Sequence, residues 1–127
     1  MFQDGQSWLA KNGDIIDILV DRSIHSESLQ CLAILRNLSF HPNGRAKLLS
    51  LTNFLSLLSQ CLGQTTEDRR QRLGLVSIWA LAANCHKAKV ILARENIPMQ
   101  LENLQQSGNF SPENCPLIST ALSVVTL

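Results

Sequence analysis

The sequence contains no tyrosine, and aromatic residues make up only 5% of its 127 residues. Without a set of aromatic side chains, the chain has no platform on which nucleic-acid bases could stack. Valine and threonine are few, and no segment alternates regularly between apolar and polar residues. Because β-strands favour those residue types and show that alternation, the sequence predicts an all-α protein.

Charge is scarce as well. Charged residues make up 17% of the chain, against roughly 25% in an average soluble domain. The net charge of +1 provides no global field that would attract nucleic acid or anionic lipid. The longest apolar run, residues 73–81, is far shorter than the roughly 20 residues that a membrane-spanning helix needs. The first residues lack the cationic start of a secretory signal. We therefore expect an intracellular protein whose four cysteines are thiols, with no nucleic-acid and no membrane partner.

Apolar residues recur at helical spacing along most of the chain. The expected N-cap of the second helix is Ser26. We expect this helix to end at the run His41, Pro42, Asn43 and Gly44. The expected cap of the fifth helix lies at Thr65 and Thr66. The segments 27–38 and 67–83 are apolar on more than one face, which is typical of helices packed between neighbours. The predicted helices are 14–20, 27–38, 45–51, 53–62, 67–83, 87–94, 97–106 and 112–125.

The two halves of the chain resemble each other. Residues 35–40 align with 78–83 and residues 54–55 with 97–98, both at a spacing of 43, while 46–49 align with 88–91 at 42. Several segments that stay in register indicate a structural repeat, since self-similarity at a fixed period is typical of repeat architectures.

The repeat resembles the armadillo repeat. The run ILRNLS at residues 34–39 is similar to the A-L-x-N-L-S pattern of that family's long helix, and residues 45–49 and 95–101 are similar to its two following motifs. The resemblance implies an armadillo- or HEAT-like right-handed α-solenoid of about three repeats. The whole chain, 1–127, would be a single repeat segment with approximate units 2–40, 42–85 and 86–127. Since residues 119–127 are still apolar, we expect an open apolar surface at that end.

A narrower resemblance concerns residues 35–44 and the cysteine-containing long helices. These are similar to armadillo-like regions of large centriolar and ciliary scaffold proteins. The resemblance implies a scaffold that takes part in centriole and basal-body assembly and in cilium formation, located at the centrosome or basal body within the cytoskeleton. Its partners would be other proteins, and no catalytic residue comes with it.

Asn37 is the first candidate binding residue. In armadillo proteins that bind extended peptides, the equivalent Asn lines the concave groove, often with a Trp one turn earlier. Here Ala33 takes the place of that Trp. In the next unit, Val76 takes the place of the Trp and Ala80 takes the place of the Asn. Asn37 is therefore open to two interpretations: a ligand contact, or a residue that satisfies the backbone of a neighbouring loop, which we favour.

Cations supply the other candidates. Arg69, Arg70 and Arg72 follow two acids at the start of a long helix and form either an exposed, self-balanced turn, which we favour, or a partner surface. A second set of cations lies at matching places in two units and is a candidate ridge for a protein partner: Arg45, Lys47, Lys87 and Lys89. The remaining candidate for partner binding is Arg36.

We expect no metal, no cofactor, no small-molecule substrate and no enzymatic activity. Cys85 and His86 have no second pair at ligand spacing, and His25, His41 and His86 lack a catalytic framework. We interpret Trp8 and Trp79 as core residues. The sequence thus favours a protein-interaction scaffold, and two alternatives stay open: an adaptor that carries extended peptides for transport, and a subunit of a nuclear chromatin complex.

Overall fold

The structure is a computed structural model that describes residues 13–63 and 66–126. These residues form eight α-helices and one short 3-10 turn, with no strand among them. The prediction of an all-α protein is confirmed over this part of the chain. The elements are α2 Gly13–His25, α3 Leu29–Leu38, α4 Pro42–Leu49, α5 Thr52–Cys61, α6 Asp68–Ala82, α7 His86–Arg94, α8 Ile97–Ser107, η1 Pro112–Asn114 and α9 Cys115–Val125.

The first turn between helices differs from the prediction. Helix α2 continues to His25 instead of ending near residue 20. Ser23 lies buried within this last part, and its hydroxyl donates to the backbone oxygen of Leu19 at 2.8 Å. The N-cap of α3 is Ser28, not Ser26: the Ser28 hydroxyl accepts a hydrogen bond from the backbone N–H of Cys31 at 3.2 Å. A cap must directly precede the first helical residue, and here that residue is Leu29.

The segment that was expected to end α3 also begins the next helix. Pro42 is the first residue of α4, where its missing N–H costs no hydrogen bond. His41 is the N-cap, and its Nδ1 accepts from the backbone N–H of Asn43 at 3.2 Å. Gly44 is buried, and a side chain there would overlap the backbone oxygen of Leu38. The close approach of these two backbones explains the glycine.

The cap of α6 was also predicted wrongly. Glu67 is the N-cap residue, and its side chain makes no capping hydrogen bond. The hydroxyl of Thr66 donates instead to the backbone oxygen of Gln60 at 2.8 Å, at the end of α5. Thr65 lies outside the described residues. Thr66 therefore closes the preceding turn rather than opening the helix.

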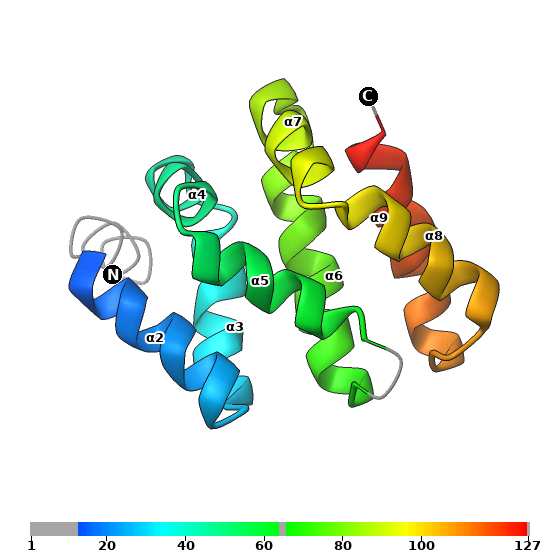
Figure 1. Cartoon of the computed structure of the whole chain (residues 1–127), viewed down its shortest axis with the longest axis horizontal. Coiled ribbons are helices and arrows are strands. Elements are labelled where there is room, and N and C mark those ends of the chain that lie inside the picture. The colour runs from blue at the N-terminus through cyan, green and yellow to red at the C-terminus, as the bar shows by residue number, and fades with distance from the viewer. Residues whose placement is uncertain (1–12, 64–65, 127) are drawn as a thin grey trace.

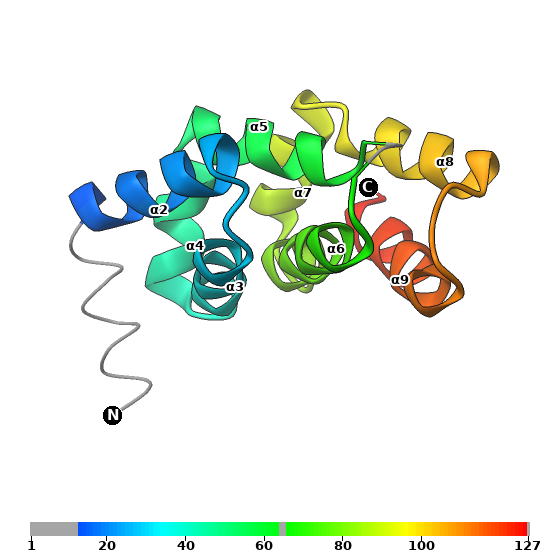
Figure 2. The same cartoon turned by 90° about the horizontal axis from the view of Figure 1, so that it is seen from below.

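The longer helices form two layers. Figure 2 shows α2, α5 and α8 in one layer and α3, α6 and α9 in the other. Helix α6 packs against both α3 and α9, and α5 packs against both α2 and α8. The short helices α4 and α7 lie along the same edge of the molecule, the upper one in Figure 1. The central helices α5 and α6 thus each cover apolar surface of a helix on either side, as expected for stacked units.

The spacing of 43 residues is visible in the burial of the long helices. Two sets of residues at matching positions of α3, α6 and α9 are at most 1% exposed, and Leu35 and Ile78 are both fully buried. The predicted register of these helices is therefore confirmed. The matching sets are Leu32, Leu75 and Ile118, followed by Leu35, Ile78 and Ala121.

The register of the short helices differs from the predicted one. Leu48 of α4 and Leu92 of α7 are both fully buried, which places matching residues 44 positions apart rather than 42. The predicted partner of Leu48 was Val90, and that residue is only half-buried. Similarity of the Ala-Lys pairs caused the error, because alanine and lysine on a short exposed helix carry little information about which face is buried.

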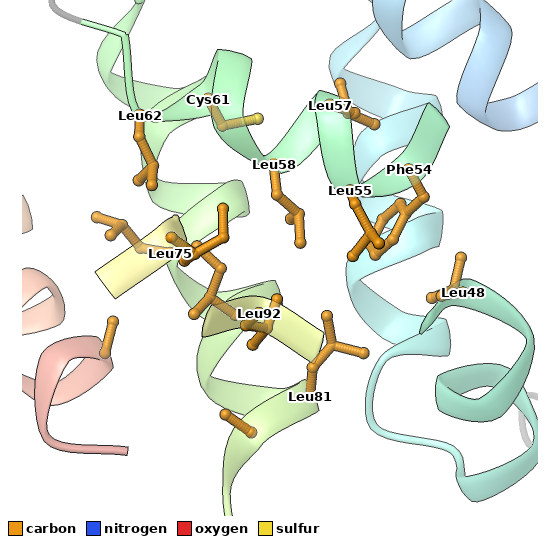
Figure 3. Close-up of a cluster of buried hydrophobic side chains, with 14 of the residues drawn as sticks. Leu48, Phe54, Leu55, Leu57, Leu58, Cys61, Leu62, Leu75, Leu81 and Leu92 are labelled. Atoms are coloured by element: carbon orange, nitrogen blue, oxygen red, sulfur yellow. The ribbon is translucent and has the colours of Figure 1, made fainter. Parts of the chain in front are cut away.

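The core lies between the two layers (Figure 3). In this view Leu57 and Leu58 come from α5, Leu75 comes from α6, and Leu48 and Leu92 come from the two short helices. Helices α5 and α6 approach each other closely at Gly74, where a side chain would overlap Cβ of Cys61. This glycine therefore fixes the distance between the two layers at the centre of the molecule.

The last helix does not leave the expected open apolar surface. Among the described residues, no large apolar side chain of α9 belongs to the exposed class. The exposed positions of this helix carry mainly small polar residues, because Ser119, Thr120 and Ser123 lie on its outer face. Leu117, Leu122 and Val124 are partly buried against the core. None of the described helices is long and apolar enough to cross a membrane.

The burial of Leu38 leads to a stability prediction. Leu38→Ala removes a fully buried side chain at the end of α3, so we expect a loss of about 2–5 kcal/mol in the free energy of unfolding. Met99→Ala is the control, because Met99 is 60% exposed and its truncation should cost less than about 1 kcal/mol. Urea unfolding followed by circular dichroism measures both, and a loss below about 1 kcal/mol for Leu38→Ala would contradict the described packing.

Candidate protein-interaction site

A groove lies between the long helices α3 and α6. Its volume is about 430 Å³, and both helices contribute to its lining. Three of the lining residues are arginines, and the others are small, apolar or uncharged. The lining residues are Leu29, Gln30, Ala33, Arg36, Arg69, Arg72 and Leu73.

Arg36 is positioned by its neighbour. Its Nε and Nη2 both donate to Oδ1 of Asn37, at 3.2 and 3.1 Å. Asn37 itself does not line the groove, and its oxygen is occupied by this arginine. Neither interpretation made from the sequence describes this contact: Asn37 here orients a cation, and no hydrogen bond from it to a neighbouring loop is found among the described residues.

Arg72 connects the groove to η1, the turn that directly precedes α9. Its Nη2 donates to Oε2 of Glu113 at 2.6 Å, and its Nε donates to Oδ1 of Asn114 at 3.1 Å. Asn114 is fully buried, and its Nδ2 donates to Oε1 of Gln71 at 2.9 Å and to the backbone oxygen of Asp68 at 3.1 Å. The charge of Arg72 is therefore compensated, and its position is fixed by a network that joins two long helices.

Arg69 differs from Arg72 because it is exposed and has no ion pair with any described residue. The oxygen that holds Arg36 belongs to a neutral amide, so Arg36 has no carboxylate partner in the described structure either. The groove therefore presents two cations whose charge is not neutralised by a carboxylate of the described chain. A negatively charged group of a partner would find hydrogen-bond donors in a fixed position there.

Arg70 was grouped with these arginines in the sequence, but the structure separates it from them. Arg70 is only 7% exposed, and it lines a different hollow together with Glu27, Gln60 and Glu67. Its buried Nη1 has no hydrogen-bond partner among the residues that the structure describes. The expectation of an exposed, self-balanced turn is therefore wrong for Arg70, because consecutive residues on a helix point about 100° apart and cannot all face solvent.

The same face carries an exposed aromatic pair. Phe40 and Trp79 are 49% and 39% exposed, and their rings meet edge to face with centroids 5.8 Å apart. Trp79 lies two turns after Arg72 on α6, on the same side of the helix. The interpretation of Trp79 as a core residue is therefore wrong. Trp8, the other tryptophan, lies outside the described residues.

Sequence comparison within the chain could have placed Trp79 on the surface. Trp79 occupies the position that Arg36 occupies in the preceding group, and an arginine position is rarely fully buried. Phe40 carried no such signal, because it follows α3 in a turn whose geometry depends on the start of α4. The groove and the aromatic pair together are called the α3–α6 face below.

The other predicted cations lie on α4 and α7. Arg45 and Lys87 line a second groove between these two short helices. Lys47 and Lys89 are half-buried and do not belong to the lining. The predicted ridge of four matching cations is therefore only partly formed, since the register shift described above moves Lys87 and Lys89 relative to Arg45 and Lys47.

The remaining chemistry-bearing residues are dispersed. Among the described residues, no group of three or more His, Cys, Asp and Glu side chains could hold a metal ion. His25 lies 3.4 Å from Asp21 on the exposed face of α2, and His41 acts as a helix cap. Burial raises the pKa of the Cys61 thiol from 9.0 to about 11, and the nearby Arg70 guanidinium offsets this only in part. A thiol held protonated in this way is a poor nucleophile.

Two curated proteins are similar to the chain. Rotatin of Mus musculus is 30% identical over 103 residues, and rotatin of Homo sapiens is 28% identical over 103 residues. The matched part is 79% of this chain but only 5% of each rotatin, so the chain spans a small fraction of these relatives. No protein-family model and no solved structure matches the chain. The similarity to rotatin is weak.

Burial predicts the order in which the cysteines react. At about pH 8, iodoacetamide should modify the exposed Cys115 and leave Cys61 largely unmodified in the folded chain. Mass spectrometry of the peptides measures this difference, which should disappear in urea.

The same burial makes stability depend on pH. Because folding raises the pKa of Cys61, the folded state binds the thiol proton more tightly than the unfolded state does. The stabilising effect of this proton should be lost as pH rises from 9.0 toward about 11.

The buried network at Asn114 gives a second prediction. Asn114→Ala leaves Gln71, which is only 1% exposed, without its side-chain partner. We expect a loss of about 1–3 kcal/mol in the free energy of unfolding, the cost of an unsatisfied buried polar group. Asn109→Ala, at an exposed position shortly before η1, is the matched control. Equal urea midpoints for the two variants would show that the network adds no stability.

Proposed function

We propose that this chain is a non-enzymatic protein-interaction scaffold, built as an armadillo-type α-solenoid, that takes part in centriole and basal-body assembly and in cilium formation. The α3–α6 face carries the interaction part of this proposal. It combines a groove, two cations without a carboxylate partner in the described structure, and an exposed aromatic pair on one side of the molecule. The similarity to rotatin supports the cellular location.

The chemistry of this face favours an acidic partner segment. Carboxylates of the partner would pair with Arg36 and Arg69, and an apolar side chain of the partner would contact Phe40 and Trp79. Aromatic and arginine residues dominate the binding energy of many protein interfaces, which suits such an arrangement. The partner would be another protein, in agreement with the expectation from the sequence.

The groove chemistry speaks against the alternative of a transport adaptor for basic peptides. Positive charge in the groove would repel a basic peptide. The tryptophan ladder of such adaptors is also missing, since Ala33 and Val76 occupy its places. No feature of the structure favours the third alternative, a subunit of a nuclear chromatin complex.

Fluorescent tagging with co-precipitation and mass spectrometry tests the proposal. The unaltered chain should stain centrosomes and recover centriolar or ciliary proteins. A variant with Arg36→Glu and Arg69→Glu should recover at least about tenfold less of the same proteins, because its groove would repel their acidic segments. Trp79→Ala should weaken recovery by a similar factor, because it removes the aromatic contact.

Met99→Ala is the matched control, since it removes an exposed apolar side chain away from the α3–α6 face. Its recovery and staining should equal those of the unaltered chain. Nuclear fluorescence, or capture of the chain by a basic nuclear-localisation peptide, would contradict the proposal and favour one of the two alternatives.

A further inference from the structure

The second groove of the molecule lies between the short helices and is called the α4–α7 groove. Its volume is about 320 Å³. Its charged lining residues are both cations, and neither forms an ion pair with a described residue. The rest of the lining is mainly apolar. The lining residues are Pro42, Arg45, Ala46, Leu49, Ser50, Cys85, Lys87 and Ile91.

The two short helices concentrate positive charge. Between them, α4 and α7 carry five Lys and Arg residues and no Asp or Glu, although the whole chain has a net charge of only +1. Arg45 and Lys87 lie in the first half of their helices, where the positive end of the helix dipole disfavours a cation. A carboxylate brought into this groove would be attracted by the side chains of Arg45 and Lys87.

A complementary surface exists elsewhere on the same molecule. Ile18, on α2, is 53% exposed, and Asp17 and Asp21 on the same helix are exposed beside it. Asp21 also lies 3.4 Å from His25, but both side chains remain about 70% accessible. Arg22, four residues after Ile18, is the one cation next to this group on the described part of the helix. On the helix, Asp17 and Asp21 lie to one side of Ile18 and Arg22 lies to the other. The apolar side chain with its two carboxylates matches a mainly apolar groove whose lining includes two cations.

Among the large exposed apolar side chains of the described residues, Ile18 is distinguished by its neighbours. Met99 has a single acid, Glu102, within one turn on its own helix. Trp79 and Ile34 have none on theirs, and Phe40 lies in the turn after α3, where residues 39–43 include no acid. The charge pattern therefore selects the Ile18 surface as the partner of the α4–α7 groove.

We propose that the α4–α7 groove of one copy receives Ile18 of a second copy. Asp17 and Asp21 of the second copy then meet Arg45 and Lys87 of the first, and Ile18 enters the apolar lining. The two surfaces are different parts of the chain, so the contact is heterologous. Each added copy leaves a groove at one end and an Ile18 surface at the other, and the assembly grows head to tail. This inference does not rest on the proposed function, which uses the α3–α6 face.

Charge reversal on each side tests the contact. The groove variant is Arg45→Glu with Lys87→Glu, and the helix variant is Asp17→Lys with Asp21→Lys. Each variant alone brings like charges together and should need at least an about tenfold higher concentration than the unaltered chain to associate. An equimolar mixture of the two variants places opposite charges at every junction, so the mixture should associate as the unaltered chain does.

Sedimentation velocity at low and high salt is the measurement, because screening should weaken the contact. Glu102→Lys, beside Met99, is the matched control and should leave association unchanged. Cys85 lies in the groove and gives a second reading: its alkylation should slow as the concentration of the unaltered chain rises, and it should not slow in the groove variant. Circular dichroism checks that all variants fold.

Several results would overturn the proposal. The unaltered chain could remain monomeric at every concentration, the two variants could associate as it does, or the mixture could fail to form a complex. Binding of a foreign acidic peptide or of single-stranded DNA without self-association would also overturn it, since the groove would then serve a different occupant.

Discussion

The arrangement of the molecule depends on the burial of α6 between two neighbours. Nine of the fifteen residues of this helix are buried, and they include polar residues such as Gln71 and Ser77. Burial on both sides requires a partner for each of these polar groups. Asn114 supplies one for Gln71, and the hydroxyl of Ser77 donates to the backbone oxygen of Leu73 in the same helix. Little of α6 is left for solvent, and that remainder forms one wall of the α3–α6 face.

Structure and candidate function are therefore linked through one helix. The side of α6 that does not contact α3 or α9 carries Arg69 and Trp79, both exposed. The packing sides of the same helix carry Gly74, which lets α5 approach, and the aliphatic residues that belong to the core. A change on the packing sides would shift the exposed side as well, so the groove is only as well defined as the core beneath it.

The sequence predicted the features that depend on long apolar patterns. The register of Leu35 and Ile78 could be recognised because every turn of a buried helix needs an apolar residue on the side that faces the core. Features that depend on a single contact were missed. Ser28 rather than Ser26 caps α3, since the chain direction at Glu27, with φ of 50°, decides which hydroxyl reaches the helix. Arg70 looked like its neighbours in the sequence, and only the position of α5 shows that it is enclosed.

The candidate surfaces were predictable to a similar extent. The sequence identified Arg36, Arg69 and Arg72 as candidates but could not show that Asn37 and Asn114 hold two of them in place. The concentration of cations on α4 and α7 was visible, whereas the groove between these helices depends on their relative position. Overall composition conceals both facts, because a net charge of +1 averages over surfaces of opposite sign.

The two spacings of matching residues have a consequence for how such a chain can change in length. The long helices keep a spacing of 43 residues, while the short helices between them are shifted to 44. One residue inserted within α6 would rotate one half of the helix by about 100° against the other and expose part of its buried side. An insertion in a turn, such as the one at Gly108, leaves every helix intact. We therefore expect length variation in this molecule to be confined to the connections between helices, where an inserted residue leaves the packing of the helices on either side unchanged.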